Sequence, residues 1–160
     1  MIRMTGRTDE VRFADEMGLL FDGQGFPLIA GRVLGWLMVC DPPEQSLTEL
    51  TEALEISKAS ASTAARMLLH LGLAERAPAT RSRGDYVRLT EGAWVQLFRS
   101  RTEFAAALRR TAERGLDLLR EAPAARRSRL ERTRRLAAFL EREMPRLLGQ
   151  FEEEEKARRC

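Results

Sequence analysis

Cysteine and histidine are scarce in this sequence, and their scarcity excludes several kinds of site. The 160 residues include two cysteines and one histidine. Cys40 lies in an apolar run and Cys160 is the last residue, so their number and spacing provide neither a disulfide framework nor a zinc site. His70 alone cannot build a histidine-based metal site, and no spacing suggests a catalytic triad. We therefore predict a protein that is not an enzyme, that holds no metal or cofactor, and that works in a reducing compartment.

Long hydrophobic runs are missing as well. The most apolar stretch, residues 28–40, contains Arg32 and is shorter than the roughly 20 residues that a membrane-spanning helix needs. Residues 1–5 lack the apolar segment of a signal peptide. The pair Gly23 and Gly25 is followed by no Gly-Lys-Ser/Thr motif and predicts a turn rather than a phosphate-binding loop. These absences predict a soluble, cytoplasmic protein with no membrane partner.

Charge is distributed unevenly along the chain, although the net charge of +3 is small. Residues 1–56 contain four basic and ten acidic side chains, whereas residues 57–90 contain six basic and two acidic ones. Residues 91–160 are basic again, with seventeen basic and twelve acidic side chains. The positive field therefore starts near Ser57, as expected for a protein that contacts nucleic acid through one local surface.

The stretch of residues 46–89 has the order of elements of a helix-turn-helix motif. Its first four residues, Ser-Leu-Thr-Glu, form a capping-box pattern that predicts a short helix over 47–54. After a break, Ser57 is a second N-cap, and Gly72 predicts the end of the helix that Ser57 opens.

Two short strands are predicted after that motif, over residues 73–77 and 85–89. Between them lies a basic tip, residues 80–84, which includes Arg81 and Arg83. A helix-turn-helix followed by a two-stranded hairpin is the winged form of the motif. We predict a mainly α-helical fold with a small β-hairpin wing.

The second helix of the motif, residues 58–71, has two chemically different faces. One face carries only alanine and leucine and suits close packing, whereas the other carries hydroxyl groups and cations but no acid. Hydroxyl groups contact phosphates and base edges, and arginine forks onto guanine in the major groove. The alternative is an ordinary amphipathic helix with a solvated face, but such faces usually mix signs, so the absence of acid favours DNA. The polar positions are Lys58 and Ser60 near the helix start, then Ser62, Thr63, Arg66 and His70.

Two helices are predicted before the motif. The first runs over residues 8–21, with Thr8 as N-cap, after a loose tail at residues 1–7; its apolar stripe is Phe13, Met17, Leu20 and Phe21. The second, over residues 27–39, is apolar nearly all round and predicts the central buried helix. In it Gly31 and Gly35 permit the close approach of another helix. Residues 8–92 are thus the predicted winged helix-turn-helix domain.

Two long helices are predicted after the wing, over residues 93–120 and 124–154. Each carries an apolar stripe at helical spacing, and Pro145 predicts a kink or a new start in the second. Little of the domain remains for these stripes to pack on, so we predict that they pack against a second copy of the chain. Residues 93–155 are the predicted dimerisation region. The alternative is an intramolecular hairpin that folds back on the winged domain.

Three segments together resemble the GbsR-type branch of the MarR winged-helix regulators. They are residues 13–21 (FADEMGLLF), 27–37 (PLIAGRVLGWL) and 57–62 (SKASAS), in a similarity over about residues 8–100. The resemblance implies a homodimeric bacterial transcription regulator on an approximately palindromic DNA site, with a recognition helix in each major groove and a basic wing tip in the adjacent minor groove. It assigns DNA contact to Lys58, Ser60, Ser62, Thr63 and Arg66, and to Arg83 in the wing, beside which this chain adds Arg81. Many relatives carry an acid just before the wing arginine, where this chain has Ser82.

The resemblance also implies a small-molecule effector, because relatives of the choline- and betaine-responsive type sense ligands. Aromatic side chains can hold quaternary ammonium groups. A suitable set comes from elements that should meet between the winged domain and the dimer helices, and the alternative is that it is simply core. A competing function is a protein–protein interaction module that uses the winged face without DNA. The candidate pocket residues are Phe13, Met17, Trp36, Trp94 and Phe98.

Overall fold

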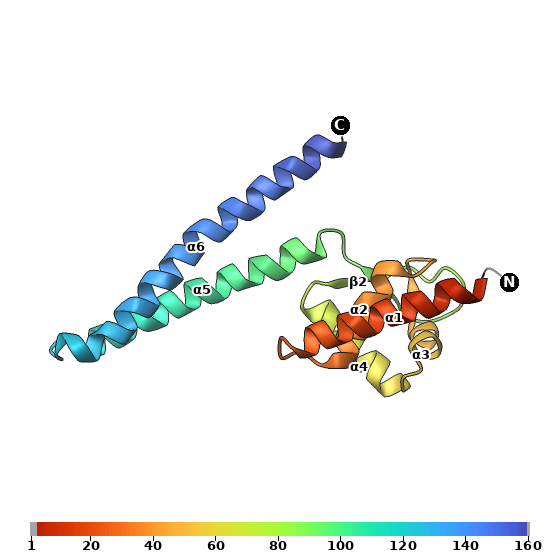
Figure 1. The fold of residues 1–160 in the computed structure, drawn as a ribbon, viewed down its shortest axis with the longest axis horizontal. Coiled ribbons are helices and arrows are strands. Elements are labelled where there is room, and N and C mark those ends of the chain that lie inside the picture. Colours follow the sequence, from red (N-terminus) through yellow and green to blue (C-terminus); the bar gives the residue numbers. More distant parts are fainter. Residues whose placement is uncertain (1–2, 160) are drawn as a thin grey trace. The chain divides into compact units, whose positions relative to one another are not determined.

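The computed structural model describes the backbone of residues 3–159 and the side chains of residues 8–159. The chain is mainly helical with one small antiparallel sheet, so the predicted fold class is confirmed. It divides into two compact units, the winged unit up to Ala93 and the helical unit from Trp94. In chain order the elements (Figure 1) are α1 (Arg3–Asp22), α2 (Leu28–Val39), β1 (Gln45–Ser46), α3 (Leu47–Leu54), α4 (Lys58–His70), β2 (Ala74–Ala77), β3 (Tyr86–Leu89), α5 (Ala93–Leu118) and α6 (Ala124–Arg159).

Helix α2 is the centre of the winged unit, as predicted, and its glycines let α1 approach closely. A Cβ atom added at Gly31 would lie 2.6 Å from the carbonyl oxygen of Met17, and one added at Gly35 would lie 2.7 Å from the Met17 Cβ. The one charged side chain of α2 is also turned towards α1, since Arg32 Nε donates to Asp15 Oδ1 at 2.6 Å. The two helices therefore meet backbone to backbone, with an ion pair beside the apolar contact.

Helix α1 differs from its prediction in where it begins and in which residues face α2. It begins at Arg3, so the predicted loose tail is wrong for residues 3–7, and Met1 and Ile2 lie outside the described residues. No proline interrupts this part of the chain, and one interior glycine costs a helix only about 1 kcal/mol, so the helix continues past the capping signal at Thr8. In the predicted apolar stripe, Leu20 is 56% exposed, because the side towards α2 is formed by residues at positions 14, 17, 18 and 21.

The sheet has three strands, in the order β1-β3-β2, rather than the two predicted. Strand β1 pairs antiparallel with β3 through Gln45 opposite Val87 and Ser46 opposite Tyr86. The Gln45 side chain is buried and paired, because it accepts from Trp36 Nε1 at 3.0 Å and donates to the Pro42 carbonyl at 2.8 Å. A strand of two residues is too short to show the alternation by which strands are recognised in a sequence.

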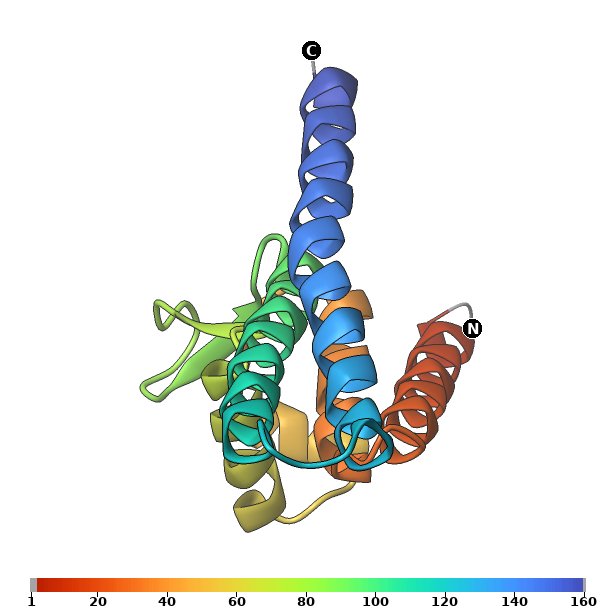
Figure 2. The same ribbon diagram turned by 90° about the vertical axis from the view of Figure 1, so that its left-hand side faces the viewer.

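The helical unit is an antiparallel pair of long helices, α5 and α6 (Figures 1 and 2). Arg109 Nε donates to Glu141 Oε2 at 2.6 Å and Arg99 Nη2 to Glu152 Oε1 at 2.5 Å, so two ion pairs link the helices. A Cβ atom added at Gly115 would lie 2.8 Å from Leu130, which shows a close approach near the connection. Beyond residue 93 the buried apolar residues are all alanine, namely Ala105, Ala112 and Ala137.

Helix α6 is longer than predicted, and it does not start anew at Pro145. It contains Pro145 in its interior without ending there and continues to Arg159, so the predicted new start at the proline is wrong. An interior proline removes one backbone hydrogen bond, which the many remaining bonds of a 36-residue helix outweigh. Among the described residues, no helix is both long and apolar enough to cross a membrane.

Candidate nucleic-acid interface

Capping residues fix both ends of α4. Ser57 is the N-cap, and its side-chain oxygen accepts from the Ser60 amide at 3.1 Å. The turn before it is closed by Glu55, whose positive φ of 53° ends α3. Leu71 is the C-cap and Gly72 has a φ of 71°, the left-handed conformation that glycine adopts readily. These signals are local, which explains why the bounds of α4 follow closely from the sequence.

The two faces of α4 lie as the sequence predicted. The inner face is buried and holds the helix on α2 and α3, through Ala61, Ala64, Ala65 and Leu68. Small residues at this contact let the backbone of α4 come close to its neighbours. The packing of the inner face against the core therefore determines which way the outer face points.

The outer face of α4 offers donors to an anion and no carboxylate. Lys58, Thr63 and Arg66 are exposed, and Ser60 and Ser62 are half-buried beside them. Arg66 Nη2 lies 3.4 Å from Thr63 Oγ1, and within the described residues neither Arg66 nor Lys58 forms an ion pair. A cation without a carboxylate partner loses no ion pair when it binds a phosphate. The helix thus brings five of the predicted contact residues onto one continuous surface.

The wing is a hairpin of β2 and β3, and its two tip arginines have different surroundings. Arg81 folds back onto α3, where Nε lies 3.0 Å from Glu49 Oε1 and Nη2 lies 3.0 Å from Glu49 Oε2. Its guanidinium also lies 5.2 Å from the ring centre of Tyr86. Arg83 is exposed and, among the residues described, forms no hydrogen bond or ion pair. Only Arg83 is therefore presented outwards by the tip.

The contact between Arg81 and Glu49 shifts the pKa of both groups. The hydrogen bonds from Arg81 hold the pKa of the Glu49 carboxyl below its ordinary value, with further lowering from the Ser46 amide. The reciprocal bond to Glu49 raises the pKa of Arg81. Both side chains therefore stay charged at neutral pH, and the Arg81 charge is partly compensated by Glu49.

Comparison with known proteins identifies the family that this geometry serves. Over 149 residues the chain is 38% identical to the HTH-type transcriptional regulator MmpR5 of Mycobacterium tuberculosis (strain ATCC 25618 / H37Rv), a similarity that covers 93% of this chain and 90% of that protein. This chain belongs to the MarR family of transcriptional regulators. A crystal structure of a transcriptional regulator matches with a TM-score of 0.80 and 39% identity over 91% of this chain and 99% of that chain.

Within the MarR family, the model for MmpR5-like MarR family transcriptional regulators matches residues 92–154, which lie almost entirely in the helical unit. Members of this family are DNA-binding regulators and not enzymes, so the predicted function class is confirmed. The comparisons support the MmpR5-like group, and the GbsR-type branch stays a prediction.

The predicted effector residues divide between the two units. Met17 and Trp36 are buried inside the winged unit and Phe13 is half-buried there, while Trp94 and Phe98 belong to the helical unit. A pocket that combines all five stays a prediction.

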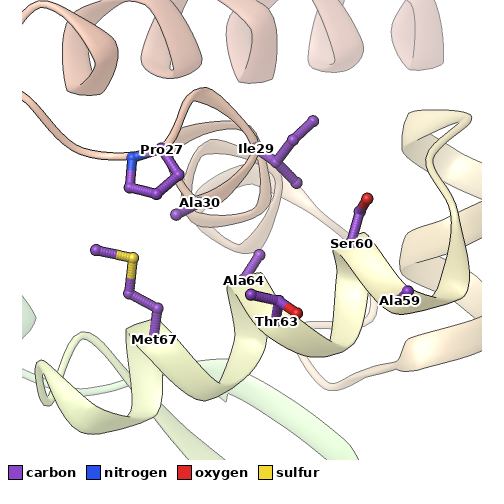
Figure 3. A pocket seen from close by; sticks show the side chains of 8 residues that line it. All are labelled: Pro27, Ile29, Ala30, Ala59, Ser60, Thr63, Ala64 and Met67. Carbon is purple, nitrogen blue, oxygen red and sulfur yellow. The ribbon is translucent and has the colours of Figure 1, made fainter.

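A separate cavity of about 330 Å³ lies between the start of α2 and the helix α4 of this MarR-family chain. Figure 3 shows Met67 and Ala64 of α4 pointing towards Pro27 and Ala30 at the start of α2. The rest of its lining includes two hydroxyl groups but no charge, so it suits an apolar group. None of the five predicted effector residues lines it; the lining is Pro27, Ile29, Ala30, Ala59, Ser60, Thr63, Ala64 and Met67.

Sequence reasoning missed the role of Glu49 and Tyr86 beneath the wing. The spacing of Glu49 from Ser46 identifies it as a capping residue, and that role is confirmed, since Ser46 N donates to Glu49 Oε2 at 2.7 Å. Its second partner, Arg81, is 32 residues away, and no local pattern connects the two positions.

Proposed function

We propose that this MarR-family protein acts as a homodimer that binds an approximately palindromic operator, with α4 of each subunit in a major groove and each wing in the adjacent minor groove. The observation that carries the proposal is the outer face of α4, which is exposed, rich in hydroxyl groups and free of acid. Such a face provides contacts to phosphate and base edges without like-charge repulsion. The winged unit thus reads DNA and the helical unit joins the two copies.

Each contact residue has a role that its length and charge suggest. We assign base reading to Arg66, since a guanidinium can bind guanine O6 and N7 in a forked geometry. Lys58 and the hydroxyl groups at the start of α4 are assigned to phosphates, and Arg83 to the minor groove. We leave Arg81 out of the direct contacts because its guanidinium is bound to Glu49.

The exposed apolar residues of the helical unit support the homodimer. Leu118 is 86% and Phe104 64% exposed, and several large apolar side chains exposed on one small unit indicate an interaction site. A second copy offers the same surface, and twofold pairing covers both at once. The residues are Phe98, Phe104, Leu118, Leu136, Phe139, Leu147 and Phe151.

Regulation would follow from occupancy of the operator, which excludes or recruits RNA polymerase. We place the protein in the cytoplasm, associated with the nucleoid when it is bound to DNA. A GbsR-type member would in addition respond to a quaternary ammonium effector held by aromatic side chains. Titration calorimetry and thermal shift with choline and betaine test this point, and no heat and no shift would remove that class of effector.

Fluorescence anisotropy tests the DNA-binding proposal. The probe is DNA from just upstream of the protein's own gene, beside a shuffled duplex, across a salt series. With roughly 6–10 phosphate contacts per dimer, we expect affinity to fall by about 10³–10⁵ from about 50 to 200 mM salt. No binding to either duplex at low salt would contradict the proposal and favour a protein–protein interaction module.

Arg66→Ala sharpens that measurement, with Arg12→Ala on the exposed side of α1 as matched control. If Arg66 reads a base, its loss should cost about 1–3 kcal/mol on the preferred sequence and relax the preference at one position. Equal loss on all sequences would reassign Arg66 to a phosphate. The control should leave affinity close to that of the unchanged protein.

A further inference from the structure

The segment that leads into the wing tip is bound to α3 through one side chain. Arg81 donates to both carboxylate oxygens of Glu49, each at 3.0 Å, and its Nη2 also donates to the Glu44 carbonyl at 2.5 Å. Its Nη1 donates to Thr80 Oγ1 at 3.1 Å. When a guanidinium donates several hydrogen bonds in a forked geometry, it also restrains the backbone of its own residue.

The acceptor for this arginine is held in place independently of the wing. Glu49 is the third residue of α3 and closes its capping box, where its Oε2 accepts from the Ser46 amide and its own amide donates to Ser46 Oγ at 3.2 Å. The carboxylate is therefore oriented by α3 before the wing reaches it. The Arg81 and Glu49 side chains are 34% and 33% exposed, so the pair is partly shielded from water and salt.

A second anchor holds the next residue of the wing. The Ser82 amide donates to the Tyr86 hydroxyl at 3.0 Å, and the Ser82 and Tyr86 hydroxyls also lie 3.0 Å apart. Tyr86 is a reliable anchor because it is only 1% exposed and pairs in the sheet with Ser46 and Ala77. The same ring lies under the guanidinium of Arg81.

The held segment ends immediately before the exposed cation. Arg83 is exposed, and Gly84 beyond it has a φ of 151° and nothing within 4 Å of an added Cβ. The order along the chain is thus two anchored residues, one outward arginine and one glycine turn. This order fixes the backbone position of Arg83 and leaves its side chain free to contact DNA.

We propose that Glu49 and Arg81 form a latch that holds the wing against α3 and thereby positions Arg83 for DNA. Both are positioning residues, and the inference rests on the proposed function in DNA binding. The latch couples the wing to the helix-turn-helix motif, so the cost of ordering the loop is met during folding instead of during binding. The basic residue added beside the wing arginine thus serves DNA binding without touching DNA.

Simple electrostatics and the latch predict opposite changes in DNA affinity when the charge of Glu49 is removed. Removing a negative charge near a polyanion tightens binding when the charge has no other role. Glu49→Gln keeps a side-chain acceptor at the third capping position but loses the charged fork to Arg81. Glu52→Gln is the matched control, because Glu52 lies one turn later on α3, is exposed, and has no ion pair among the described residues.

The first experiment measures operator affinity by anisotropy across a salt series for these variants. We expect Glu49→Gln to weaken binding about three- to tenfold, while Glu52→Gln leaves it unchanged or slightly tighter. Arg81→Gln should produce a similar loss with the salt slope unchanged, and the double variant should lose no more than the weaker single one. Arg83→Gln should instead reduce the salt slope by about 1.

Two results in that experiment would overturn the latch. One is tighter binding by Glu49→Gln, equal to that of Glu52→Gln. The other is a fall of about 1 in the salt slope for Arg81→Gln, which would make Arg81 a direct phosphate contact.

Hydrogen exchange of the DNA-free protein measures how firmly the wing is held. It therefore tests the latch even if the proposed DNA binding is wrong. Amides of the segment 80–86 should exchange faster in Glu49→Gln and Arg81→Gln than in Glu52→Gln, with the amides of α3 unchanged in all three. Unchanged exchange in the wing segment would overturn the latch even if all variants bind DNA normally. Faster exchange together with no DNA binding by the unaltered protein would contradict the proposed function and the role of the latch in it.

Discussion

The winged unit and the helical unit bury different side chains. In the winged unit the fully buried side chains include Tyr86 and large aliphatic residues such as Leu34, Leu50 and Leu68. In the helical unit the buried positions are alanines, and seven large apolar residues are exposed. Burying a leucine or phenylalanine contributes about 1.5–3 kcal/mol, and an alanine much less. The winged unit therefore has a core of large side chains, whereas the helical unit leaves several large apolar side chains exposed.

This difference is the basis for the proposed homodimer, because it separates a unit with its own core from one with exposed apolar side chains. The ion pairs of Arg109 and Arg99 link α5 with α6, but the first is only part-buried and the second is more exposed, so they contribute little stability compared with an apolar core. In the proposed homodimer, a second copy provides the packing surface for the large exposed side chains. The same proposed contact would bring two winged units to the two half-sites of one operator.

The largest effect should come from a charge placed on the exposed apolar surface of the helical unit. Phe104→Glu would bury a carboxylate at the proposed contact between copies, so we expect monomers and a loss of operator affinity of about 100-fold or more. Light scattering and anisotropy measure the two effects. Gln96→Glu, at an exposed polar position of the same helix, is the control and should stay dimeric. A Phe104→Glu protein that remains a dimer would contradict the proposed contact.

A smaller effect, on the free energy of unfolding, should come from replacing one glycine in each unit by alanine. In Gly31→Ala the new methyl would lie 2.6 Å from the Met17 carbonyl oxygen, so we expect the free energy of unfolding to fall by about 1–3 kcal/mol. In Gly149→Ala nothing lies within 4 Å of the methyl, so the helix should gain about 0.5–1 kcal/mol. Urea unfolding followed by circular dichroism measures both. Equal shifts in one direction would contradict the difference in packing between the units.

The pH dependence of the latch should be smaller again. The pKa of Glu49 is lowered from its ordinary 4.5, so the pair stabilises the folded state above pH 4.5 and loses that contribution as pH falls through the lowered pKa. The stability difference between the unaltered protein and Glu49→Gln should therefore be constant near neutral pH and shrink below pH 4.5. Glu52→Gln should show no such convergence, and a difference independent of pH would contradict the assignment.

A test that leaves stability and DNA binding untouched concerns Cys40, which reports on packing at the end of α2. Burial raises the pKa of its thiol to about 11 from 9.0. The thiolate is the reactive form, so alkylation at pH 8 should be about 100-fold slower than for an unburied cysteine. The measurement uses a Cys160→Ser background and an unfolded sample as reference. Rapid alkylation of the folded protein would show that the end of α2 opens.

Much of the winged unit could be predicted because its signals are local. The capping box at Ser46, the N-cap at Ser57 and the stop at Gly72 each act within one turn of their own position, and each is confirmed. The close approach at Gly31 and Gly35 was likewise predictable from small residues on an apolar helix.

The rest depends on contacts between distant residues. Strand β1 exists only because Gln45 and Ser46 meet β3, and the Glu49–Arg81 pair joins two elements that no local pattern connects. The apolar stripes of the long helices were visible, but the sequence could not show which apolar residues would be buried, and among the described residues of the helical unit these are alanines. Periodicity identifies an apolar surface, whereas the choice among packing partners is made by the tertiary structure.

The most direct test of this account is hydroxyl-radical footprinting of the protein on DNA upstream of its own gene. A twofold dimer with α4 in successive major grooves predicts two protected regions related by symmetry, with centres about 10 base pairs or a multiple of that apart. Phe104→Glu should remove both regions together. A single protected region that persists in that variant would contradict the claim that the helical unit brings two winged units to one operator.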